Sequence, residues 1–142
     1  SVTAAPSNPG LKATWHEFKG NKCSEIEKAP INGTYPVEDV MIPKKVKGNI
    51  GLIIKGYFNA PQDDIYTFAL LSDDGSTLTI DSEQIVDNDG PHGPKEIVGQ
   101  KALAKGYHPM ELRYFDQNGG QLKLKVTGSD GKEIPFTHLY AH

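Results

Sequence analysis

The chain has 142 residues, of which 37% are hydrophobic and 23% charged, as in an ordinary soluble globular domain. Its net charge of −3 argues against nucleic acid as a partner, because phosphate binding needs an excess of lysine and arginine. No apolar run approaches the roughly 20 residues of a membrane span, so we expect no membrane insertion. Because Cys23 is the single cysteine, an internal disulfide and a cysteine-based zinc site are both excluded.

Apolar and polar residues alternate with a period of two through most of the chain, which predicts β-strands. The pattern is clearest at 121–127, where Leu122, Leu124 and Val126 share one face. The runs 50–58 and 65–71 are more uniformly apolar, and this predicts central strands that are covered on both faces. Further strand candidates in chain order are 11–18, 76–80, 84–86, 96–98, 107–115 and 134–136.

Turns that contain glycine separate these runs, for example at Asp89-Gly90 and Asp130-Gly131. Many short strands at this spacing predict an all-β fold, a single jelly-roll-like antiparallel β-sandwich. We assign residues 1–9 to a linker and residues 10–142 to the domain. Within the domain, residues 21–47 are the least regular part, with room for one short strand or a turn of helix.

The densest group of polar residues is Ser72-Asp73-Asp74-Gly75-Ser76, at the tip of a predicted hairpin. Two adjacent carboxylates on a tight loop repel each other, and a bound cation relieves that repulsion. Calcium suits such a site, because it takes about 6–8 oxygen ligands. On spacing alone, a solvated Asp-Gly turn explains these residues equally well.

Two other loops are rich in polar residues, 87–93 and 116–120. The first contains Asp-x-Asp-Gly, but the remaining ligands and the flanking helices of an EF-hand are missing. A structural role is the simpler explanation for each of the five histidines, so no zinc site is expected. The sequence also lacks a Gly-x-Ser-x-Gly nucleophile motif and a phosphate-binding loop, and we expect a non-catalytic module.

Several of these segments together resemble the anthrax protective antigen-type (PA-fourteen) domain family. The resemblance rests on 56–61, on 65–81 with its Ser-Asp-Asp-Gly-Ser motif, on 85–93, and on 104–115 followed by the Gly119-Gly120 turn. It implies a β-sandwich of the kind attached to secreted bacterial glycosidases and found in calcium-dependent adhesins. The implied location is extracellular, at the cell surface or periplasmic. The implied partners are a glycan or polysaccharide and the adjoining domains of a parent chain.

The resemblance also implies a ligand set. In sugar-binding members, two consecutive aspartates joined by a cis peptide ligate one calcium ion, which then binds paired sugar hydroxyls. This sequence has Asp73 and Asp74 at the matching positions. Asp116 or Asn118 would supply a further oxygen from the loop at 116–120, which we call the late loop. The residues expected to contact the glycan are Asp73, Asp74, Asp89, His92, Gln117 and Asn118.

Three functions follow as hypotheses. The favoured one is a calcium-dependent carbohydrate-binding accessory module of a larger secreted or cell-surface protein, such as a glycoside hydrolase. The alternative is a structural or interaction domain that packs against a catalytic domain and exposes an apolar patch. An enzyme that uses Asp73 and Asp74 as a hydrolytic pair ranks last, because glycosidase carboxylates flank the scissile bond at roughly 5–10 Å separation.

Overall fold

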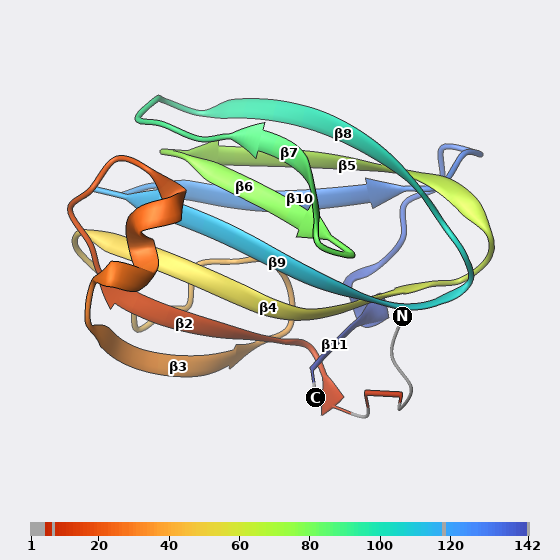
Figure 1. The fold of residues 1–142 in the computed structure, drawn as a ribbon, viewed down its shortest axis with the longest axis horizontal. Helices are drawn as coiled ribbons and strands as arrows, with labels where there is room; N and C mark the ends of the chain where they lie inside the picture. Colours follow the sequence, from red (N-terminus) through yellow and green to blue (C-terminus); the bar gives the residue numbers. More distant parts are fainter. Residues whose placement is uncertain (1–4, 7, 118, 142) are drawn as a thin grey trace.

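The computed structural model describes residues 5, 6, 8–117 and 119–141, which form a sandwich of two antiparallel β-sheets (Figure 1). Eleven strands and two short 3₁₀ helices lie in this part of the chain. In chain order they are β1 (Asn8–Pro9), β2 (Leu11–Glu17), η1 (Cys23–Lys28), β3 (Ile31–Val37), β4 (Ile50–Ala60), β5 (Asp64–Asp73), β6 (Ser76–Ile80), β7 (Glu83–Asn88), β8 (Lys95–Leu103), β9 (Gly106–Asp116), β10 (Gln121–Thr127), η2 (Phe136–His138) and β11 (Leu139–Ala141).

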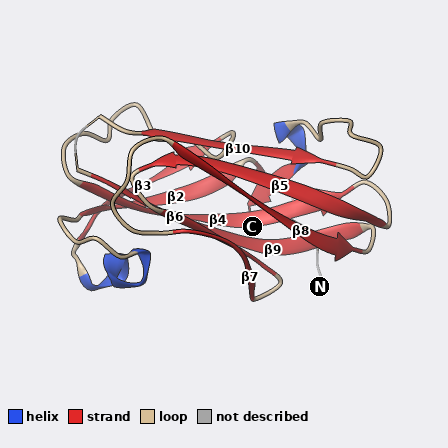
Figure 2. Ribbon diagram, turned by 90° about the horizontal axis from the view of Figure 1, so that it is seen from above, coloured by secondary structure: helices blue, strands red, loops and turns tan. Residues whose placement is uncertain are grey.

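The two sheets differ in size. The large sheet has the order β1-β11-β4-β9-β6-β7, and β2 joins it through β4 and carries β3 on its other side. The small sheet has the order β10-β5-β8, and its strands lie over the large sheet (Figure 2). Each strand pair is antiparallel, so the all-β sandwich predicted from the alternating pattern is confirmed.

The main core lies between the sheets. Strand β5 contributes Tyr66, Phe68 and Leu70, every second residue, and all three are fully buried. Phe58 of β4 meets two of these rings edge to face, at centroid distances of 5.4 Å to Tyr66 and 5.7 Å to Phe68. Such pairs add about 0.5–1.5 kcal/mol each beyond the area they bury, so they fix the two sheets together.

A second apolar cluster covers the other face of the large sheet. It contains Phe18, Ile26, Ile53 and Phe115, packed under η1 together with Cys23. Leu52 and Ile54, the neighbours of Ile53, face the main core instead. The first half of β4 is therefore buried on both faces, as its continuous apolar run predicts.

The corresponding prediction for 65–71 is wrong. Strand β5 alternates strictly between buried and more accessible residues, and Ile65 is 53% exposed. This happens because β5 is the centre of the small sheet, whose outer face carries no described helix or strand. The apolar residues on that face are small or half-exposed rather than part of a second core.

The early segment is more regular than expected, because residues 21–47 contain both η1 and the seven-residue strand β3. The closing strand lies later than predicted: Phe136 belongs to η2, and β11 begins at Leu139. Asn8 and Pro9, which the sequence assigns to a linker, pair with Ala141 and Tyr140. Among the described residues, no helix combines the length and the apolar character needed to cross a membrane.

Candidate functional site

Three carboxylates meet at one end of the sandwich, on the left in Figure 1. Asp73 ends β5 in the small sheet, Asp116 ends β9 in the large sheet, and Asp74 lies in the loop that leads from β5 to β6. One oxygen from each group lies within 4.8 Å of the other two. Asp73 and Asp74 are half-buried, whereas Asp116 is only 4% exposed. We call these three residues the acidic cluster.

The backbone of the loop is held against β9. The peptide bond between Asp73 and Asp74 is cis, as the family resemblance implies. The Asp74 amide donates to the Phe115 carbonyl at 3.2 Å, and the Phe115 amide donates to the Gly75 carbonyl at 3.0 Å. These bonds continue the pairing of β6 with β9 and bring the loop carboxylate to the end of β9.

Two further hydrogen bonds hold Asp73 and Asp116 in place. The Tyr114 hydroxyl donates to the Asp73 carbonyl at 2.6 Å, and the Gly120 amide donates to Asp116 Oδ2 at 2.7 Å. Burial, and then the nearby negative charges of Asp116, Asp73 and Asp74, raise the pKa of Tyr114 well above its usual value. The phenol therefore stays protonated and remains a hydrogen-bond donor.

The cluster concentrates negative charge. Two unit charges 4.8 Å apart repel by about 3 kcal/mol at an effective dielectric constant of 20. Within the described part of the chain, no lysine or arginine forms an ion pair with Asp73 or Asp74. A bound cation with a preference for oxygen ligands would offset this repulsion, and the donor set of three carboxylates fits calcium.

The loop between β7 and β8 reaches the cluster through its backbone. The His92 amide donates to Asp74 Oδ1 at 3.1 Å. The His92 ring lies within its own loop, with its nitrogens 2.8 Å from the Asn88 carbonyl and 2.7 Å from the Gly93 carbonyl. The main chain of His92 thus holds Asp74, while both nitrogens of its ring meet carbonyl groups of its own loop.

Asp89 faces a different element. Its carboxylate accepts hydrogen bonds from the Cys23 amide, at 3.0 and 3.3 Å, and from the Gly90 amide at 2.8 Å. The side chain expected to contact a glycan is therefore directed to the start of η1. It joins η1 to the β7–β8 loop, and that loop in turn contacts Asp74.

The late loop contributes Gln117, which is exposed beside the cluster. Its amide donates to Asp74 Oδ2 at 3.4 Å, and its side-chain Nε2 donates to the Lys19 carbonyl at 3.5 Å. Asn118 lies outside the described residues, so its role as a metal ligand and glycan contact stays a prediction.

A buried polar network lies next to the acidic cluster. Its central residue is Asn88, which the sequence did not single out. This side chain is 2% exposed, and its Nδ2 donates to the carbonyl of Lys95 at 2.8 Å and to that of Leu70 at 3.3 Å. Asn88 Nδ2 also donates to Ser72 Oγ at 3.3 Å. The Ser72 and Ser76 hydroxyls share a 2.5 Å hydrogen bond across the loop 73–75. The network links β7 to both ends of that loop.

Replacing Asn88 by leucine is expected to lower the free energy of unfolding by about 2 kcal/mol, because it removes a buried donor from three acceptors. Urea unfolding followed by tryptophan fluorescence measures this loss. The control is Asn32→Ala, since the exposed Asn32 side chain makes a single 3.3 Å bond to the Glu17 amide. Equal unfolding midpoints for the two variants would contradict the proposed importance of the network.

Cys23 is buried at the start of η1, with its Sγ 3.8 Å from the Arg113 carbonyl. Burial, followed by the hydrogen bond and the charge of Asp89, raises the pKa of this thiol far above its usual value. Because the thiolate is the reactive form, we expect a thiol-specific disulfide reagent to label the native domain very slowly at neutral pH. Labelling should become fast in denaturant, and equally fast labelling of the native domain would show that η1 does not protect the thiol.

The domain is thus a β-sandwich with an acidic cluster at one end. Comparison with known proteins shows the family to which it belongs. The PA14 domain model matches residues 7–136, so the chain belongs to the PA14 domain family. The family resemblance seen in the sequence is thereby confirmed. No curated protein sequence matches the chain.

Solved structures share this fold. The PA14 sugar-binding domain from an RTX adhesin has a TM-score of 0.79 at 17% identity, with 96% of this chain and 100% of that chain covered. The A domain of epithelial adhesin 6 from Candida glabrata, solved with Galβ1-3GlcNAc, has a TM-score of 0.71 at 13% identity, with 99% and 89% covered. A β-glucosidase from Kluyveromyces marxianus, solved with glucose, has a TM-score of 0.65 at 17% identity, with 84% and 16% covered.

Proposed function

We propose that this domain is a carbohydrate-binding module whose acidic cluster holds a calcium ion that binds sugar hydroxyls. The observation that carries the proposal is the convergence of Asp73, Asp74 and Asp116 within 4.8 Å at one end of the sandwich. Membership of the PA14 family supports it. Further support comes from two similar folds, one described as sugar-binding and the other solved with a bound disaccharide.

The chemistry of the site follows from its donors. Calcium takes about 6–8 oxygen ligands, so three carboxylates leave positions for water or for neighbouring hydroxyls of a sugar. Asp116 is buried and would anchor the ion from below, while Asp73 and Asp74 are more accessible. Asn118 would add a side-chain oxygen from the late loop. Gln117, exposed next to the cluster, would contact the glycan at its edge.

The same arrangement favours a module that binds without catalysis. In glycosidases, the two carboxyl groups lie on either side of the scissile bond, about 5–5.5 Å apart in retaining enzymes and 6.5–9.5 Å apart in inverting enzymes. Here the three groups converge instead of flanking a space for a sugar ring. We infer an accessory domain of a larger protein at the cell surface or outside the cell, such as a glycoside hydrolase or an adhesin.

A glycan array tests the proposal. The fluorescently labelled domain is applied once in calcium and once after treatment with a chelator. We expect a subset of glycans to be bound only in calcium, because the ion is itself the contact with the hydroxyls. Binding that persists in the chelator, or no binding to any glycan in calcium, would contradict the proposed mode of binding.

The competing function is an interaction domain that packs against a neighbouring domain. Two exposed apolar side chains favour it, Ile65 and Val98, each 53% exposed on the outer face of the small sheet. Under this alternative, calcium has no effect on the melting temperature of the domain. A melting temperature that rises with calcium concentration therefore favours the carbohydrate-binding function.

A further inference from the structure

A pocket lies at the opposite end of β2 from the acidic cluster. Glu17, at the end of β2, pairs with Ile50, and Ile50 pairs with Asp116 of the cluster. The start of β2 pairs with Val37, which lines a pocket of about 840 Å³. Six residues of an extended strand span roughly 20 Å, so the pocket is independent of the acidic cluster.

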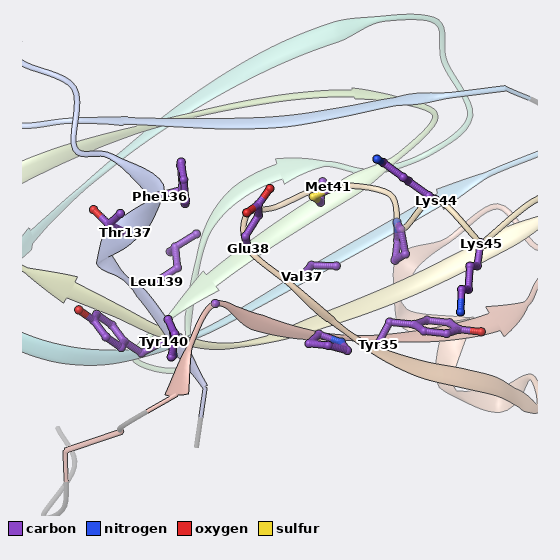
Figure 3. A pocket seen from close by; sticks show the side chains of 14 residues that line it. Tyr35, Val37, Glu38, Met41, Lys44, Lys45, Phe136, Thr137, Leu139 and Tyr140 are labelled. Atoms are coloured by element: carbon purple, nitrogen blue, oxygen red, sulfur yellow. The ribbon is translucent and has the colours of Figure 1, made fainter.

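The floor and the walls of this pocket are apolar. Val37 and Leu139 form part of its floor and are 7% and 5% exposed. Three aromatic residues border the space, Tyr35 on one side and Phe136 and Tyr140 on the other (Figure 3). Phe136 is 49% exposed, although a side chain of that size is normally more buried. The volume lies within the 300–1,000 Å³ that is typical of pockets for small ligands.

The rim of the pocket is charged, with an excess of positive charge. Lys45 lies beside Tyr35, the Lys44 side chain extends toward Met41, and Glu38 lies between the lysines and Phe136 (Figure 3). Both lysines are exposed, and neither forms an ion pair with a residue that the structure describes. An apolar floor next to two free ammonium groups complements a ligand that has an apolar body and an anionic end.

We propose that this pocket binds a small aromatic carboxylate. The ring packs on the apolar floor beside Tyr35, whose own ring favours edge or offset contacts with another aromatic ring (Figure 3). The carboxylate pairs with Lys44 or Lys45. A sugar acid fits less well, because Val37 and Leu139 on the floor offer its hydroxyls no side-chain hydrogen-bond partner in exchange for lost water.

An NMR titration of the ¹⁵N-labelled domain with 4-hydroxycinnamate tests the proposal. We expect saturable shifts confined to Gly10 and to residues 35–45 and 136–140, with and without a calcium chelator. The neutral amide of the same compound should bind roughly 10-fold more weakly, since it loses the ion pair. No saturable shifts, shifts centred elsewhere, or equal binding of the amide would each overturn the proposal.

Exposed variants locate the contacts without disturbing the core. Lys44→Ala/Lys45→Ala should weaken binding of the carboxylate roughly 10-fold and leave binding of the amide unchanged. The matched control is Lys105→Ala/Lys125→Ala, two exposed lysines outside the pocket, which should bind like the wild type. Two additional probes decide the class of ligand: glucuronate that binds as tightly, or an acidic aromatic peptide that binds while 4-hydroxycinnamate does not, would overturn the assignment.

Discussion

Replacing Asp73 and Asp74 together by asparagine is expected to abolish calcium binding and every calcium-dependent change in stability. Calcium at about 100 times its dissociation constant should stabilise the wild-type domain by about 2.7 kcal/mol. For a domain of this size, that corresponds to a rise in melting temperature of roughly 5–10 °C. The variant should show no rise, because two of the three converging carboxylates are gone. Differential scanning calorimetry in calcium and in a chelator measures both proteins.

The same double variant also has an expected effect on the melting temperature without calcium. In the chelator, the Asp73→Asn/Asp74→Asn variant should melt at the same temperature as the wild type or higher, because the repulsion among the carboxylates is reduced. Glu96→Gln is the matched control: Glu96 is an exposed acid on β8 that pairs with Leu71, near the end of β5. The control should keep the full calcium shift. Loss of that shift in the control, or its survival in the double variant, contradicts the assignment.

Gly120→Ala is expected to lower the free energy of unfolding by about 2–3 kcal/mol and to weaken calcium binding at least roughly 10-fold. A Cβ atom at this position would collide with the Asp73 carbonyl oxygen and the Tyr114 hydroxyl, and would lie 2.6 Å from Asp116 Cγ. Those groups cannot yield cheaply, since the Tyr114 hydroxyl is bonded to the Asp73 carbonyl and the Gly120 amide to Asp116. The clash therefore displaces two of the three carboxylates.

Gly93→Ala provides the comparison for this variant. Gly93 is exposed in the loop between β7 and β8, and no atom lies within 4 Å of a Cβ built there. We expect both stability and calcium affinity to remain close to those of the wild type. Urea unfolding and calorimetric titration with calcium are the measurements. A Gly120→Ala variant that binds calcium like Gly93→Ala would show that the close packing around Gly120 is not needed for the site.

Most strands could be predicted from the sequence, because the burial of a strand in a sandwich imposes a period of two. The alternation around Leu124 corresponds to β10, and the apolar run that begins at Ile50 corresponds to β4. The exposure of Ile65 could not be predicted in the same way. Whether the outer face of a sheet is covered depends on other elements, here on η1 packing over Ile53 with no counterpart described over β5.

The turns, too, could be predicted from the sequence only in part. The turn between β6 and β7 places Asp81 and Ser82 at φ values of 51° and 66°, the left-handed region that glycine usually occupies. Without a glycine, the sequence carries no strong signal for this turn.

The acidic cluster could also be predicted only in part. Asp73 and Asp74 stand out because they are adjacent in the sequence, and the family resemblance adds the late loop. The convergence of Asp116 with them depends on the pairing of β9 with β6 and on the position of β5 across the sandwich. Asn88 had no sequence signal, because an asparagine before an Asp-Gly turn looks like part of the loop. Its role appears only when β7 lies against β5 and the start of β8.

The most direct test is a crystal structure of the domain grown with calcium and a glycan selected from the array. We predict one calcium ion with an oxygen of Asp73, Asp74 and Asp116 each at about 2.3–2.6 Å, and two sugar hydroxyls completing its coordination. A structure in saturating calcium without an ion among these three side chains, or with the glycan bound away from them, would contradict the account.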